Sequence, residues 1–320
     1  MQGLSAQRQA PSLRLQGGRR RRQLRLRRSV AGWLFAAPWL IGFLGFTAGP
    51  MLASVYLSFT SYDLMQAPRW IGLANFNRLL DDPRVWNSIK VTTLFSFISV
   101  PVNLLFGLVL ALLLNQRIRG LGVWRTLYYL PAIVPAAAMG MLWRWLLDGQ
   151  FGFVNYLLED GLGIAGPNWL TSRDWVIPAF IIMSFWGVGV PMVINLAGLQ
   201  NIPVTLYEAA QIDGASGWRK LRDITLPLLS PVILFNLLIG IIGALQSFTI
   251  FFVVTGGGPN HASETLMLYL YDNAFQFLRM GYASALAWVL FVYILIVTLI
   301  VHRFSSQWVY YESPLERKDA

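Results

Sequence analysis

The sequence predicts an all-α polytopic membrane protein, and both its composition and the distribution of its charges support this prediction. The chain has 320 residues, of which 56% are hydrophobic and 12% are charged, which is too apolar for an ordinary soluble domain. Asp, Glu, Lys, Arg and His are absent from six blocks, which are residues 29–62, 91–116, 126–143, 175–207, 224–260 and 280–301. A helix needs roughly 20 apolar residues to cross a bilayer core, and each block supplies about that number.

The blocks predict six transmembrane helices, near residues 31–59, 90–114, 124–147, 175–198, 228–254 and 282–303. They are too long for strands of a membrane barrel, whereas a helix satisfies its own backbone hydrogen bonds in lipid. Each charge at a helix centre costs roughly 2.5–3.5 kcal/mol, so long charge-free blocks are typical of spans. The expected organisation is therefore a tail over 1–28, a six-helix membrane domain over 29–305 and a C-terminal tail over 306–320.

The basic residues predict the orientation. Nine of the 25 lie directly before the first block, at Arg8, Arg14, Arg19, Arg20, Arg21, Arg22, Arg25, Arg27 and Arg28. Arginines at that position retain the N-terminus in the cytoplasm and can rest on membrane lipid headgroups. This clustering makes a nucleic-acid partner an unnecessary explanation of the +10 net charge. Six spans then return the C-terminus to the cytoplasm and place residues 200–227 on the cytoplasmic side.

A polar segment, EAAQIDGASGWRKLRDITLPLLSP over 208–231, separates two long apolar blocks. Pro203 suits the first turn of a helix, and Gly214 suits the stop of a helix over 204–213. Ser216 can cap a second short helix, which Pro227 is expected to close or kink. Two short helices joined by a glycine turn predict a stiff projection that meets another protein.

The spacing of this segment resembles the EAA signature of binding-protein-dependent ABC importer permeases. Asp213-Gly214-Ala215 and Leu226-Pro227-Leu228-Leu229 resemble the sugar-importer branch, as does Thr255 to Pro259. Gly72 to Phe76 resembles, more weakly, a segment of the family between its first two spans. The resemblance covers about residues 30–305 and implies the type I importer permease fold. It also implies that the ATPase-coupling residues are Glu208, Ala209, Ala210, Asp213, Gly214, Ala215, Leu226 and Pro227.

The same resemblance implies the function and the partners. The chain is expected to import a sugar or sugar-like solute through the cytoplasmic (inner) membrane of a bacterium or archaeon. An ABC ATPase dimer, a second and similar permease subunit, and an extracytoplasmic solute-binding protein are the expected partners. ATP-Mg is expected on the ATPase chains, because this chain contains no G-x-x-x-x-G-K-[ST] phosphate loop. We therefore expect neither enzymatic activity nor a cofactor on this chain.

Polar and aromatic residues within the two spans that flank the EAA segment are the candidate substrate contacts. Sugars are recognised by hydrogen bonds to hydroxyls and by stacking on aromatic faces. The candidates are Ser184, Trp186, Gly187, Asn195, Asn236, Gln246 and Ser247. We expect Trp186 and Gln246 to matter most, although buried amides also bridge helices without touching a ligand.

Three other classes of function fit less well. A stand-alone secondary carrier or channel is the main alternative, but the spans lack the intramembrane acids that such proteins use. A membrane-embedded enzyme is disfavoured because the chain has no cysteine and only two histidines, so neither a catalytic nor a metal site is expected. An anchoring scaffold would explain the polar projection but not six spans.

Overall fold

The computed structural model describes residues 32–116 and 119–310, which form helices and one small sheet. The chain divides into two compact units, Met1–Tyr56 and Leu57–Ala320. The described part of the first unit belongs to a 27-residue apolar helix, Gly32–Ser58, long enough to span a bilayer. A π turn, η1 (Leu44–Ala48), interrupts it before α2 (Gly49–Ser58). The predicted tail over 1–28 lies outside the described residues.

The second unit begins with a small connecting structure. Strand β1 (Thr60–Ser61) pairs antiparallel with β2 (Arg69–Trp70), and α3 (Ala74–Asp81) follows. The long helix α4 (Pro83–Leu114) starts at Pro83 rather than at the expected residue 90. The reason is local: the Asp82 side chain accepts the Arg84 N–H at 2.9 Å, and proline suits the first position of a helix.

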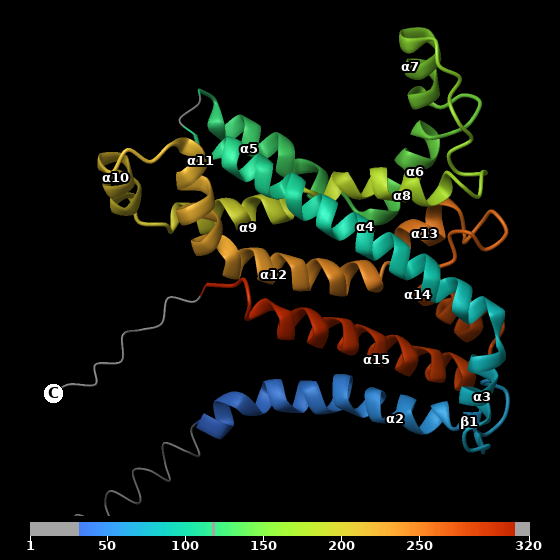
Figure 1. Ribbon diagram of the computed structural model, residues 1–320. Helices are drawn as coiled ribbons and strands as arrows, with labels where there is room; N and C mark the ends of the chain where they lie inside the picture. The colour runs from blue at the N-terminus through green and yellow to red at the C-terminus, as the bar shows by residue number, and fades with distance from the viewer. Residues whose placement is uncertain (1–31, 117–118, 311–320) are drawn as a thin grey trace, which may run out of the picture. The chain divides into compact units, whose positions relative to one another are not determined.

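Four helices form the centre of the second unit (Figure 1). Helix α4 packs against α9 (Gly189–Gln200) and α12 (Leu226–Leu245), and α12 packs against α15 (Met280–Ser305). One core cluster lies where α4, α9 and α12 meet, and it includes Leu110, Ala111, Leu114, Met192, Leu196, Leu199 and Leu229. Close packing of these side chains fixes the relative positions of the three helices.

Two of the predicted spans are bent helix pairs. Helix α5 (Leu121–Tyr129) continues into η2 (Leu130–Ile133), and α6 (Ala136–Leu146) leaves at 97°. Val134 is extended there, with ψ 131, as expected for a residue before proline. Helix α8 (Val176–Ser184), with η3 (Phe185–Gly187), meets α9 at 45°. Among the described residues four helices are long and apolar enough to cross a membrane, or six if each bent pair is one span.

The fifth predicted span differs at both ends. Helix α11 (Gly217–Lys220) continues through a π turn, η4 (Leu221–Thr225), directly into α12, so Pro227 does not close it. The Leu226 N–H bonds the Leu221 carbonyl across this wider turn, which shifts the carbonyls that the proline ring would otherwise meet. At the other end α12 stops at Leu245, and α13 (Thr249–Val254) begins after an unwound stretch.

Three further short elements complete the second unit. Helix α7 (Phe153–Leu162) lies in the segment between α6 and α8, where Asn155 accepts the Trp169 indole N–H at 2.7 Å. Helix α14 (Leu266–Tyr271) and the π turn η5 (Asp272–Gln276) precede α15. Figure 1 shows α14 beside the N-terminal end of α4, whereas α10 (Val204–Ile212) and α11 lie toward the opposite end of the unit.

Candidate functional site

The EAA segment forms a helix–turn–helix whose turn is built on Gly214. Helix α10 is followed by Gly214 in the left-handed region, with φ +74. The Gly214 N–H bonds the Gln211 carbonyl at 3.1 Å, and the Ala215 N–H bonds the Ala210 carbonyl at 2.8 Å. This is the Schellman pattern, which glycine favours because it has no Cβ. The Ser216 hydroxyl caps α11 by accepting the Arg219 N–H, so both local predictions are confirmed.

The side chains of the motif are presented outward. Glu208 and Asp213 are exposed, and their carboxylates make no hydrogen bond or ion pair within the described part of the chain. Two large apolar side chains beside the turn, Ile212 and Trp218, are 87% and 68% exposed. Unpaired carboxylates next to exposed apolar side chains are typical of a surface that binds a partner.

The other predicted coupling residues divide between the turn and its base. Ala209 and Gly214 are exposed, whereas Ala210, Ala215, Leu226 and Pro227 are half-buried. At the base, the Tyr207 hydroxyl lies 2.9 Å from the Thr225 hydroxyl, which donates to the Lys220 carbonyl at 3.2 Å. Tyr207 also packs on the core cluster of α4, α9 and α12. The projection is therefore attached firmly to the core formed by α4, α9 and α12.

A cavity of about 290 Å³ lies between α4, α9 and α12. Four of the seven predicted substrate contacts line it, namely Ser184, Gly187, Asn236 and Ser247. Ser247 belongs to the unwound stretch after α12, and its backbone carbonyl accepts a hydrogen bond from the Thr265 hydroxyl at 3.1 Å. Irregular backbone is tolerated at membrane depth where it lines a cavity, so the break in the predicted span has a structural reason.

The other three predicted contacts lie outside this cavity lining. Asn195 is fully buried and accepts the Asn236 amide at 2.9 Å, so this pair bridges α9 and α12. Trp186 lines a separate hollow with Trp143, whose ring it meets edge to face at 5.7 Å. Gln246 is exposed at the end of α12. Trp186 and Gln246 were the two leading candidates, and the described structure places neither in this cavity.

Asn103 on α4 lines the cavity and was missed by sequence reasoning. Its amide nitrogen donates to the Ser184 hydroxyl at 2.7 Å and to the Ser99 carbonyl at 2.8 Å. Its amide oxygen is buried and has no partner among the described residues. Its signal in the sequence is an amide well inside the charge-free block 91–116, a block that does not border the EAA segment.

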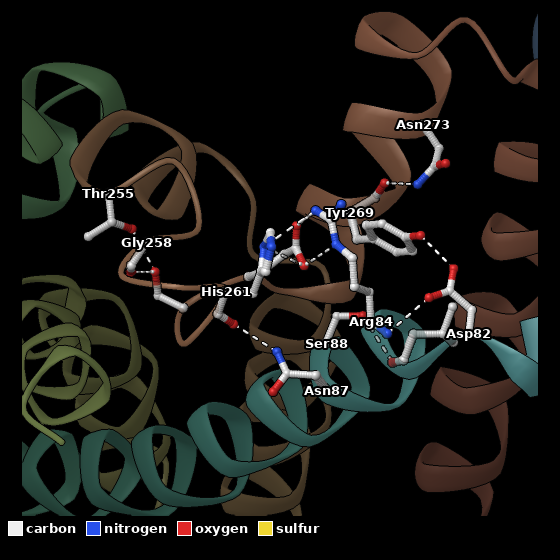
Figure 2. Close-up of polar contacts among 12 residues, drawn as sticks. Asp82, Arg84, Asn87, Ser88, Thr255, Gly258, His261, Tyr269 and Asn273 are labelled. Carbon is white, nitrogen blue, oxygen red and sulfur yellow. Dashed lines mark hydrogen bonds and ion pairs between the residues drawn. The ribbon is translucent and has the colours of Figure 1, made fainter. Parts of the chain in front are cut away.

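A network of charged and polar residues holds the opposite end of the second unit together, and Figure 2 shows Asp82, Arg84, His261 and Tyr269 from it. We call Asp82, Arg84, His261, Glu264, Tyr269 and Tyr282 the Arg84 cluster. Arg84 forms an ion pair with Glu264, which is only 2% exposed. The His261 ring lies 3.3 Å from the same carboxylate, and the Asn87 amide donates to the His261 carbonyl at 2.7 Å. These contacts fasten the 255–265 loop to the first turns of α4.

Asp82 is the second centre of the Arg84 cluster. Its carboxylate accepts the hydroxyls of Tyr269 at 2.6 Å and Tyr282 at 2.7 Å. Burial raises the pKa of Asp82, but these hydrogen bonds and the Arg84 N–H together outweigh burial and bring the pKa below its usual range. Burial and the nearby Glu264 charge raise the pKa of Asp272. The Arg84 cluster is largely satisfied within the chain, so it has the character of a structural site.

Apolar helices around a mostly apolar cavity that carries a few polar groups, with an exposed EAA turn at one end, define a membrane transport protein. The chain belongs to the family of binding-protein-dependent transport system inner membrane components, whose pattern matches residues 103–309. It is therefore a multi-pass permease subunit of an ABC importer and not an enzyme, since the ATPase of such importers is a separate chain. Binding-protein and ATPase partners follow in general terms from this family.

Individual relatives agree with the family. Over 90% of its length the chain is 43% identical to the probable ABC transporter permease protein YesP of Bacillus subtilis, covering 94% of that protein. It is 36% identical to the trehalose/maltose transport system permease protein MalF of Thermococcus litoralis, over 87% and 94% of the two chains. The bacterial alginate ABC transporter, solved in complex with an alginate pentasaccharide-bound periplasmic protein, gives a TM-score of 0.77 at 25% identity, over 88% and 96%. The resemblance inferred from the EAA segment is confirmed.

Proposed function

We propose that this permease carries a sugar or sugar-like solute into the cell through the cytoplasmic membrane of a bacterium or archaeon. In this proposal it has six spans, with each bent helix pair counting as one, and both termini lie in the cytoplasm. A relative that transports trehalose and maltose and a structural neighbour that transports alginate support a carbohydrate substrate. The solute is delivered by an extracytoplasmic binding protein to this chain and a second, similar permease.

One observation carries the coupling role: the motif carboxylates are exposed and unpaired on a turn anchored to α9 and α12. We assign Glu208, Ala209, Ala210, Asp213, Gly214, Ala215, Leu226 and Pro227 to coupling with an ATPase dimer that binds ATP-Mg. When ATP binding closes the ATPase dimer, the dimer would pull the projection, and α9 and α12 would move with it. Because α9 and α12 line the cavity, such a movement opens or closes the solute pathway.

Purification in mild detergent, followed by reconstitution, tests this proposal. The tagged chain should co-purify with a P-loop ATPase and a second multi-span permease. Proteoliposomes of this complex, supplied with the cognate binding protein, should take up a sugar only when ATP is present on the ATPase side. Recovery of the chain alone, under conditions that preserve a known importer complex, together with ATP-independent uptake, would instead establish a stand-alone carrier.

The orientation has its own test, because the chain contains no cysteine. Single cysteines replace Gly161 on α7 and Ser216 on the EAA turn, and intact cells are treated with a membrane-impermeant maleimide. Labelling of the Gly161→Cys protein but not of the Ser216→Cys protein is expected. The reverse pattern would overturn the proposed orientation while leaving the family assignment intact.

A further inference from the structure

The cavity between α4, α9 and α12 has a chemical character that narrows the substrate, and the inference rests on the proposed function. Its lining is mostly apolar, with polar groups contributed by Ser99, Asn103, Ser184, Asn236 and Ser247. None of the described residues that line it is charged. An ionised solute would find no opposite charge there, and an unpaired charge in an apolar surrounding is costly.

The hydrogen bonds around Asn103 determine which atom of its amide is left without a partner. The Ser99 carbonyl can only accept, so the atom that lies 2.8 Å from it must be the amide nitrogen. The Ser184 hydroxyl donates to the Ile181 carbonyl at 2.6 Å, so it accepts the second amide hydrogen. Both Asn103 donors are thus used within the chain. The remaining group is the buried amide oxygen, which can only accept.

Two glycines leave room for a solute in this cavity. A Cβ added at Gly187 or at Gly243 would meet no atom within 4 Å, apart from the helix's own backbone and its chain neighbours. Both residues line the cavity, from η3 and from α12. Its volume of about 290 Å³ lies at the lower end of the range of small-molecule sites, roughly 300–1,000 Å³. The space suits a solute unit about as large as one sugar ring.

We propose that this cavity receives an uncharged, hydroxyl-rich solute, and that the Asn103 amide oxygen accepts a hydrogen bond from one of its hydroxyls. A hydroxyl is the group that matches a fixed, desolvated acceptor, and an anion is the group that such an acceptor repels. The substrate of this importer is therefore a neutral sugar or polyol rather than a sugar acid or a sugar phosphate. Asn103 becomes a specificity-determining residue on a helix that the EAA motif does not flank.

The absence of cysteine makes the cavity accessible to a direct test on the assembled importer in nanodiscs. A single cysteine replaces Gly243, where the added side chain meets open space. We measure the rate at which neutral methyl methanethiosulfonate modifies it, and compare the rate for the anionic sulfonatoethyl reagent. Ala67→Cys in the exposed β1–β2 loop is the matched control. The neutral reagent should be favoured at Gly243→Cys more than at Ala67→Cys, and equal preference at the two positions would contradict an anion-excluding cavity.

Solute protection tests Asn103 itself. The probes are glucose, galactose and glycerol, each paired with its anionic counterpart glucuronate, galacturonate or glycerol phosphate. At least one neutral probe should slow modification of Gly243→Cys while its anionic counterpart does not. Adding Asn103→Leu should raise the concentration needed for half-protection about tenfold, the factor that one hydrogen bond to the ligand supplies. Leu105→Ala, two residues along on an exposed part of α4, is the control that should leave protection unchanged.

The possible outcomes separate this inference from the proposed function. Protection by an anionic probe, protection by none of the neutral probes, or protection that is indifferent to Asn103→Leu would each overturn the assignment of the cavity. ATP-driven uptake by the unmodified complex is measured independently in proteoliposomes. A complex that transports but fails the protection test has its solute site elsewhere. If the complex transports nothing, the proposed function fails whatever the labelling shows.

Discussion

The two ends of the second unit differ in the exposure and the pairing of their carboxylates. At the EAA turn, Glu208 and Asp213 are exposed, and neither carboxylate has a partner within the described residues. In the Arg84 cluster, Glu264 is 2% exposed and paired, and Asp82 accepts three hydrogen bonds. The first end leaves both carboxylates exposed to solvent. The second end completes itself.

This difference indicates what each end is for. A carboxylate that is exposed and unpaired contributes little to the stability of its own chain, so its presence in a matched motif points to a partner. An ion pair with a buried carboxylate helps to hold the fold together, because removal of its partner leaves an uncompensated buried charge. Substitutions at the EAA turn should therefore impair transport without unfolding the chain. Substitutions in the Arg84 cluster should mainly lower the free energy of unfolding.

The largest effect is expected at the EAA turn. Glu208→Arg reverses the exposed charge, and Gly214→Val places a β-branched residue at φ +74, a conformation it rarely adopts. Each variant should insert normally, but ATP-driven uptake in proteoliposomes should fall close to background while ATP hydrolysis continues. Uptake at the unmodified rate by both variants would refute the coupling role.

Two controls accompany these variants. Gly217→Ala adds a side chain three residues further on, where the φ is ordinary and the space is open, and it should retain uptake. Glu159→Arg reverses an exposed acid on α7, away from the turn, and should also retain uptake. Loss of uptake in either control would mean that the loss in the test variants is not specific to Glu208 and Gly214.

The next effect in size belongs to the Arg84 cluster. Glu264→Gln removes the negative charge beside Arg84, whose side chain is 34% exposed and can partly turn to water. We expect the free energy of unfolding of the purified complex to fall by about 2 kcal/mol, less than for a fully buried pair. Asp223→Asn breaks the exposed Arg222–Asp223 pair at 3.8 Å and should cost less than about 1 kcal/mol. Equal losses in thermal unfolding would erase the distinction between the two ends.

Much of the EAA end could be predicted from the sequence, because its structure is determined by neighbouring residues. A helix stop at Gly214 and a cap at Ser216 depend on contacts three to five residues apart, and both were found. Charge-free blocks likewise indicated the apolar helices. The bend at Val134 was also readable in principle, since Pro135 follows it.

The Arg84 cluster and the cavity depend on contacts between distant parts of the chain. Arg84 and Glu264 are 180 residues apart, and nothing in either local sequence indicates the other. The break after α12 contains no proline or glycine within Gln246–Phe248, and its freed carbonyl at Ser247 is satisfied by Thr265. The role of Asn103 could not be predicted for the same reason. Its amide is visible in the sequence, but the orientation of that amide depends on a hydrogen bond to the distant Ser184.

A smaller effect tests how firmly the EAA turn is anchored. Tyr207→Phe removes the 2.9 Å contact with the Thr225 hydroxyl while keeping the ring in the core. The free energy of unfolding should fall by about 1 kcal/mol, the usual value of one hydrogen bond. Uptake should fall further than stability accounts for, because a looser turn transmits less movement. Thr126→Ala, which removes an exposed hydroxyl bond on α5, is the control that should leave uptake unchanged.

The smallest expected effect is a pH dependence of stability at the Arg84 end, where the pKa values of two carboxyl groups are shifted in opposite directions. The folded state lowers the pKa of Asp82, so the stability from this group is present above the unfolded pKa of about 3.9. That stability is lost as the pH falls through the folded pKa. The folded state raises the pKa of Asp272, so its contribution is present below about 3.9 and is lost as the pH rises through the folded pKa.

Acidification from neutral pH should therefore first raise the melting temperature of the complex, as Asp272 takes up its proton, and then lower it as Asp82 is protonated. Asp272→Asn should remove the rise, and Asp82→Asn should remove the part of the fall below pH of about 3.9 that belongs to Asp82. Asp213→Asn at the EAA turn should change neither limb, because that carboxylate is exposed and has no partner among the described residues. A profile altered as much by Asp213→Asn as by Asp82→Asn would show that the EAA end, too, relies on its own carboxylates.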